Sequence, residues 1–211
     1  MGPMTIAEVL PYVLLGTGTT LSLIVAIGAQ NAYVLKQGII GKFVWPIAIF
    51  CILSDVLLIG LGVLGFGALV DSAGWVLEIL RWGGGAFLLT YGIMAARRAL
   101  HPAAMTVQQS ADSGPQTLGK ALTLAAAMTY LNPHTYLDTF VLLGGIATQQ
   151  GDYRWYFYAG ALLGSTIWFC SLAAFSRFLR PVFANPKAWR ILDGAIALLM
   201  FFLAYKIIFS H

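Results

Sequence analysis

The sequence predicts an all-α membrane protein of about six transmembrane helices, arranged as two inverted repeats of three. The 211-residue chain is 59% hydrophobic and only 9% charged, whereas soluble domains carry roughly 25% charged residues. Its mean hydropathy is +0.82. So few polar side chains cannot cover a surface in water, and the lipid bilayer is the expected solvent.

The apolar residues gather in six runs with few charges. A spanning helix needs roughly 20 apolar residues, and the third and sixth runs reach that length with apolar turns that begin near Trp75 and Trp189. We do not expect the first run to be a cleaved signal peptide, because its first basic residue, Lys36, follows the apolar segment instead of preceding it. The runs cover residues 9–35, 43–70, 82–96, 121–151, 155–176 and 194–205.

Basic residues near the ends of the runs predict the orientation, because cytoplasmic loops carry an excess of Lys and Arg. Nine of the twelve basic residues lie on the side of residues 36–42, 97–120 and 177–190. The other side holds Arg81, Arg154 and Lys206. We therefore expect both termini to lie outside the cytoplasm.

One sizeable loop, residues 98–119, divides the single transmembrane domain. It is rich in Ala, Ser, Gln and Pro and has no hydrophobic period, which is typical of a flexible linker. It separates half 1 (1–97) from half 2 (120–211). Three spans in each half force opposite orientations, the inverted-repeat plan of many secondary transporters.

The first and fourth spans carry matching polar interruptions, "GAQN" (28–31) and "NPH" (132–134). Proline removes a backbone donor, and irregular backbone at membrane depth persists only where protein or a watery cavity satisfies it. Paired interruptions in two halves point to a transporter's binding site, although a packing kink is the alternative. We expect helix breaks at Gly28 and Pro133, and substrate-binding amides at Gln30, Asn31 and Asn132.

Two acidic residues, Asp55 and Asp138, interrupt otherwise uncharged runs. A carboxylate at the bilayer centre costs on the order of 2.5–3.5 kcal/mol and usually faces a cavity or a partner. No basic residue shares a span centre with them, so we expect them to bind an external cation or proton; the alternative is protonated acids that hydrogen-bond between helices. His134 is four residues before Asp138, on the same helix face, and is expected to orient the acid or relay protons.

Other polar and small-residue signals receive structural interpretations. "GLGVLG" (60–65), Gly83–Gly85 and the Gly160/Gly164 pair are interpreted as helix-packing features. Cys51 and Cys170 lie in apolar surroundings and are expected to be inert, with a membrane thiol–disulfide carrier as the alternative. Five other acids are expected at span ends or in loops, where charge costs little, and receive no chemistry: Asp71, Glu78, Asp112, Asp152 and Asp193.

With these residues in view, the chain resembles the lysine exporter (LysE) family of bacterial basic-amino-acid exporters over essentially its whole length. The resemblance rests on "AIGAQNAYVLKQGI" (26–39), "LSDV" (53–56), "RWGGGAFLL" (81–89), "LNPHTYLDTFV" (131–141) and "NPKAWR" (185–190). Family members commonly carry Pro where this chain has Ala29, so the first break must depend on Gly28 and the amides. The family's two membrane aspartates map onto Asp55 and Asp138.

The resemblance implies a transporter of the bacterial inner membrane, not an enzyme, that exports L-lysine, L-arginine or both. We expect proton antiport in the lipid bilayer, with no cofactor, no resident metal and no nucleic acid; a homodimer remains open. The alternatives are a divalent-metal or other cation exporter of a related family and the thiol–disulfide carrier.

Overall fold

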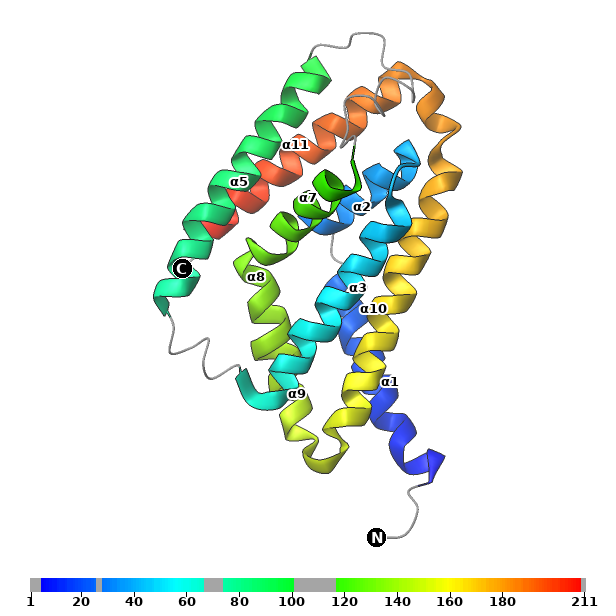
Figure 1. The fold of residues 1–211 in the computed structure, drawn as a ribbon, viewed down its shortest axis with the longest axis vertical. Helices are drawn as coiled ribbons and strands as arrows, with labels where there is room; N and C mark the ends of the chain where they lie inside the picture. Colours follow the sequence, from blue (N-terminus) through cyan, green and yellow to red (C-terminus); the bar gives the residue numbers. More distant parts are fainter. Residues whose placement is uncertain (1–4, 26–27, 67–73, 101–116, 210–211) are drawn as a thin grey trace. The chain divides into compact units, whose positions relative to one another are not determined.

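The fold is helical, with two interruptions inside segments that were predicted to span the membrane (Figure 1). The computed structural model describes residues 5–25, 28–66, 74–100 and 117–209, and these ranges contain helices and turns but no strand. The prediction of an all-α membrane protein is confirmed. The elements are α1 (Ile6–Ile24), α2 (Ala29–Ile40), α3 (Val44–Leu61), π-helical η1 (Gly62–Phe66), α5 (Gly74–Leu100), α7 (Leu118–Tyr130), α8 (Pro133–Tyr136), π-helical η2 (Leu137–Leu143), α9 (Gly144–Gln149), 3-10 helix η3 (Gly151–Tyr153), α10 (Arg154–Ser176), 3-10 helices η4 (Arg177–Leu179) and η5 (Val182–Ala184), and α11 (Pro186–Phe209).

Four helical segments within the described ranges are long and apolar enough to cross a membrane: Ile6–Ile24, Val44–Gly65, Gly151–Leu179 and Pro186–Phe209. The third predicted run forms α5, which has 27 residues but carries glycines and flanking Arg side chains. The fourth run, residues 121–151, is divided among the shorter helices from α7 to α9. Most of the predicted linker, residues 101–116, lies outside the described residues.

Both predicted interruptions are present. Gly28 has an extended backbone (φ −109°, ψ 175°) and precedes the first residue of α2. After α7 ends at Tyr130, Leu131 caps it, and Pro133 is the first residue of α8. Proline suits a first helical position because its missing N–H would have no partner within the helix.

The chain forms two compact units, and each draws on both predicted halves. Unit 1 comprises Met1–Ala26, Cys51–Leu77 and His134–Phe169, and unit 2 comprises Ile27–Phe50, Glu78–Pro133 and Cys170–His211. The two interrupted helices are divided in opposite senses. The part before the first break, α1, belongs to unit 1, whereas the part before the second break, α7, belongs to unit 2.

In unit 1, glycines bring helices into backbone contact. A Cβ on Gly160 of α10 would overlap the Val13 carbonyl of α1, and one on Gly62 would overlap the Thr139 carbonyl of η2. Thr17 Oγ1 of α1 also donates to the Gly160 carbonyl, at 2.9 Å. The packing interpretation of these glycines is confirmed. The buried core beside them consists of Ile59, Val63, Leu143, Ala147, Phe157 and Ala161.

In unit 2, the short helix α2 is enclosed by other parts of the unit. Ten of its twelve residues are buried. Tyr33 Oη donates to the Ala121 carbonyl of α7 at 3.1 Å, and Arg180 Nε donates to the Gly38 carbonyl at 3.2 Å. The helix ends at Gly41, whose φ of +84° lies in the left-handed region that favours glycine. Further along, α5 packs on α11 (Figure 1), where Arg81 Nε donates to the Ile208 carbonyl at 2.9 Å.

We predict that Gly160→Ala destabilises the protein by about 1–3 kcal/mol, because the added methyl group must push α1 and α10 apart. Gly145→Ala in α9 is the matched control, since no atom lies within 4 Å of its Cβ position. It should be neutral or stabilising by up to about 1 kcal/mol. Thermal unfolding in detergent measures both changes, and equal melting temperatures for the two variants would contradict the close helix contact.

Candidate functional site

Asp55 is a buried carboxylate on α3, in unit 1. Asp55 is 7% exposed, and Ser165 Oγ of α10 donates a hydrogen bond to Asp55 Oδ2 at 2.5 Å. Within the described ranges, no Lys or Arg forms an ion pair with it. A short hydrogen bond from a hydroxyl stabilises the ionised acid but does not neutralise its charge. Asp55 is therefore a negative group on a membrane helix without a protein counterion in this part of the chain.

Asp138 also belongs to unit 1 and lies on the π-helical segment η2, which follows the second interruption. His134 Nε2 is 4.0 Å from Asp138 Oδ1, at the i, i+4 spacing that the sequence predicted. The side chains are 59% exposed for His134 and 28% exposed for Asp138. Single-turn π-helical insertions often occur at functional sites. From its exposed fraction, the Asp138 side chain is more accessible than Asp55.

Gln30 and Asn31 occupy the first turn of α2, in unit 2. Asn31 is 9% exposed. The Gln30 Nε2 is buried and has no hydrogen-bond partner among the described residues. The first N–H groups of a helix also lack partners within the helix and attract negative charge. This helix start therefore offers donors suited to a carboxylate.

Asn132 lies between α7 and α8 and is half-buried. It belongs to unit 2, as does Pro133, whereas His134 begins the next segment of unit 1. The "NPH" sequence thus marks the chain's passage from one unit to the other. The structure brings Asp55, Asp138 and His134 into one unit, and it assigns the three amides to the other.

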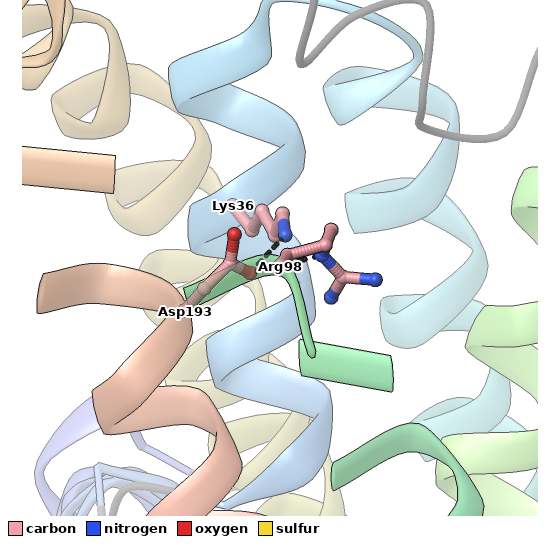
Figure 2. A network of polar contacts seen from close by, with 3 residues as sticks. All are labelled: Lys36, Arg98 and Asp193. Atoms are coloured by element: carbon pink, nitrogen blue, oxygen red, sulfur yellow. Dashed lines mark hydrogen bonds and ion pairs between the residues drawn. The ribbon is translucent and has the colours of Figure 1, made fainter. Parts of the chain in front are cut away.

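A second charged cluster, in unit 2, joins Lys36 of α2, Arg98 of α5 and Asp193 of α11 (Figure 2). Lys36 Nζ lies 2.5 Å from Asp193 Oδ1, and Arg98 Nε lies 3.3 Å from the same oxygen. Asp193 is 1% exposed and Lys36 is 7% exposed. In Figure 2 the terminal nitrogens of Arg98 point away from Asp193. One carboxylate thus holds two cations and connects three helices.

The expectation that Asp193 lies where charge costs little was wrong. Asp193 follows the start of α11 at Pro186 by about two turns, and α2 packs beside it, so both Asp193 and Lys36 are removed from solvent. The sequence carries only weak, local signs that these two charges are buried. Asp193 lies between Leu192 and Gly194, and Lys36 lies inside "YVLKQGII" (33–40). Only the packing of three distant segments shows that these charges meet.

Cys51 and Cys170 are not joined in a disulfide; Cys51 is buried and Cys170 is partly buried. Cys51 belongs to unit 1 and Cys170 to unit 2. In the part of the chain that the structure describes, no group of three or more His, Cys, Asp or Glu residues could hold a metal ion.

Long apolar helices, two interrupted helices and a buried acid without a basic partner in the described ranges together define a class, the multi-pass membrane translocators. The chain belongs to the LysE type translocator family, whose family model matches residues 21–211.

Named relatives agree with this family. A Mycobacterium tuberculosis protein whose name proposes amino-acid transport is 43% identical over 85% of this chain and 88% of its own length. The lysine exporter LysE of Corynebacterium diphtheriae is 40% identical over 89% of this chain and 94% of its own length. An arginine exporter protein of an Enterobacter species is 36% identical over 94% of this chain and 93% of its own length. No solved structure matches the chain.

We predict that Asp193→Asn lowers the stability of the protein by about 3–5 kcal/mol, because it leaves the buried Lys36 ammonium without its counterion. A double variant, Lys36→Met with Asp193→Leu, should recover most of that loss. Apolar side chains of similar volume can replace a buried ion pair, and the Arg98 side chain, which is 21% exposed, can turn toward solvent. Thermal unfolding in detergent is the measurement.

The matched control is Asp152→Asn, because Asp152 is exposed in η3. It should leave the melting temperature unchanged. If the double variant unfolds no later than Asp193→Asn, the charge pair is not what the single substitution disrupts.

Proposed function

We propose that the protein is a secondary active exporter of basic L-amino acids, lysine, arginine or both, driven by inward movement of protons. The observation that carries the proposal is Asp55, a buried carboxylate whose partner is a serine hydroxyl, not a cation. Such a group requires a proton or an external cation to complete it. The names of the relatives, a lysine exporter and an arginine exporter, supply the chemistry of that cation.

Proton exchange follows from the electrical work of export. Moving one positive charge outward against an inside-negative potential costs about 2.3 kcal/mol per 100 mV. A proton that moves inward for each exported monovalent cation cancels this work. In our mechanism Asp55 and Asp138 alternate between protonation and pairing with the substrate's cationic side chain or α-ammonium, while His134 orients Asp138.

The α-carboxylate of the substrate is assigned to the amides at the two interruptions. Gln30, Asn31 and Asn132 carry amide N–H groups at the two interruptions, and the Gln30 Nε2 has no partner within the described ranges. The start of α2 adds backbone donors and the positive end of the helix dipole. This is the arrangement by which broken helices of transporters receive a substrate carboxylate.

The opposite division of the two interrupted helices between the units supports the proposal of two inverted halves, 1–97 and 120–211. Inversion exchanges the two ends of corresponding helices, so the part before the break should fall in opposite units, as α1 and α7 do. With three spans in each half, we place both termini outside the cytoplasm of a bacterial inner membrane. Reporter fusions to the two ends test this orientation.

Asp55→Asn and Asp138→Asn should each reduce proton-driven efflux of labelled lysine or arginine from proteoliposomes to the level of protein-free vesicles, because neither amide can carry the coupled charge. Asp152→Asn, an exposed acid on η3, is the control and should transport as the unmodified protein does. Efflux that survives in both Asp55→Asn and Asp138→Asn would refute the carboxylate mechanism.

The thiol–disulfide alternative makes a different prediction. Under our proposal, a double variant with Cys51→Ser and Cys170→Ser retains full amino-acid export, since neither thiol takes part. The same efflux assay measures this. Loss of export in a variant that keeps its melting temperature would favour cysteine chemistry instead.

A further inference from the structure

Thr20 of α1 carries a buried hydroxyl that has no hydrogen-bond partner among the described residues. The residue is 2% exposed, and its Oγ1 has no hydrogen-bond partner in the described part of the chain. The neighbouring threonines differ, since Thr17 Oγ1 donates to the Val13 carbonyl and Thr19 Oγ1 to the Leu15 carbonyl. An unsatisfied buried hydroxyl costs about 1–3 kcal/mol, so its retention calls for an explanation.

The packing of α1 on α10 places Thr20 near Ser165. Gly160 contacts Val13, and Gly164 contacts Thr17 and Thr20, so the two helices run in the same direction with their residues in step. The Thr20 Cβ lies 3.3 Å from the position of a Cβ on Gly164. Ser165 is the next residue, and its hydroxyl donates to Asp55. Thr20 therefore packs on α10 at the residue before the serine that donates to Asp55, inside unit 1.

The accessible area of these groups limits what they can bind. Ser165 is 0% exposed, Thr20 is 2% exposed and Asp55 is 7% exposed. The head group of an amino acid needs space that these side chains do not leave. A proton needs only a chain of groups that both donate and accept hydrogen bonds, as hydroxyls do. The Asp138 side chain, at 28% exposed, is open to a larger cation.

We propose that the two membrane acids divide the work: Asp55, with Ser165 and Thr20, forms the proton site, and Asp138 receives the cationic group of the substrate. This inference rests on the proposed function and refines its mechanism. In place of two acids that both alternate between proton and substrate, it assigns the coupling ion and the substrate to different carboxylates. Ser165 and Thr20 are positioning residues that govern how a proton reaches Asp55.

The proton step is balanced. The O–H bond of Ser165 breaks as its proton moves to Asp55 Oδ2. Ser165 Oγ takes a proton from the Thr20 hydroxyl after that side chain has turned toward it, and the Thr20 oxygen takes one from solvent water. The net change is one proton gained by Asp55, with both hydroxyls restored, and release to the opposite side reverses the transfers.

Two assays on proteoliposomes separate proton transfer from substrate binding. Net efflux of labelled arginine or lysine into an acidic medium requires both steps. Exchange of labelled for unlabelled substrate at equal pH on both sides requires no net proton movement. Thr20→Val, Ser165→Ala and Asp55→Asn should lower net efflux by about a hundredfold or more, since a positioned proton-transfer group contributes roughly 10²–10⁴-fold, and should lower exchange far less. Asp138→Asn should abolish both.

Conservative and neighbouring variants complete the test. Thr20→Ser, which retains a hydroxyl, should restore net efflux. The matched controls are Thr19→Val, whose hydroxyl is engaged with Leu15, and Thr166→Val, which is exposed beside Ser165; both should leave net efflux and exchange unchanged.

Each outcome has one meaning. If Thr20→Val and Ser165→Ala lower exchange as much as net efflux, or leave net efflux intact, the proton site is refuted. A sodium gradient that drives efflux without a pH gradient also refutes it. If the unmodified protein moves neither lysine nor arginine in either assay, the proposed function itself fails.

Discussion

A short helix can be enclosed within a membrane protein only if the protein satisfies most of its polar groups. In α2, among the described residues, the buried side-chain atoms left without a partner are Gln30 Nε2 and Gln37 Oε1. Ten of its twelve residues are buried, although its sequence contains amides and a lysine. Tyr33, Lys36 and the Gly38 carbonyl each meet a partner from a different segment of unit 2. In hydrocarbon, each unsatisfied polar group would cost several kcal/mol. These contacts allow the first predicted span to break at Gly28, so that a separate helix, α2, begins at Ala29.

The same constraint separates the aspartates into two kinds. Asp193 contacts both Lys36 and Arg98, so its charge is compensated within the protein and its role is to hold α2, α5 and α11 together. Asp55 is almost as buried but accepts from a serine hydroxyl. A compensated carboxylate gains nothing from a passing cation, whereas an uncompensated one does. Burial alone therefore does not identify a transport site; the nature of the partner does.

Much of the fold could be predicted from the sequence because its causes are local. Apolar run lengths predict helices, Gly28 and Pro133 mark the two breaks, and an acid inside an uncharged run, such as Asp55, is visible without a structure. The Lys36–Asp193 pair could not be predicted, because it depends on α2 being enclosed. Residues 36 and 193 are far apart in the chain, and no local pattern shows that a lysine after an apolar run turns inward. For the same reason the burial of the Thr20 hydroxyl without a partner among the described residues could not be predicted, because it depends on how α1 packs.

The two interruptions also explain why Ala29 can stand where the resemblance to the LysE family leads us to expect proline. In each interruption a residue outside the helices directly precedes the new helix: Gly28 precedes Ala29, and Asn132 precedes Pro133. The first residue of a helix has no internal partner for its N–H, so proline loses no hydrogen bond there and alanine gains none. The break at Gly28 depends instead on the extended backbone of the glycine and on the contacts that hold α2 within unit 2. Proline would therefore fit at position 29, but the break does not require it. The break requires that α2 be enclosed by its contacts within unit 2.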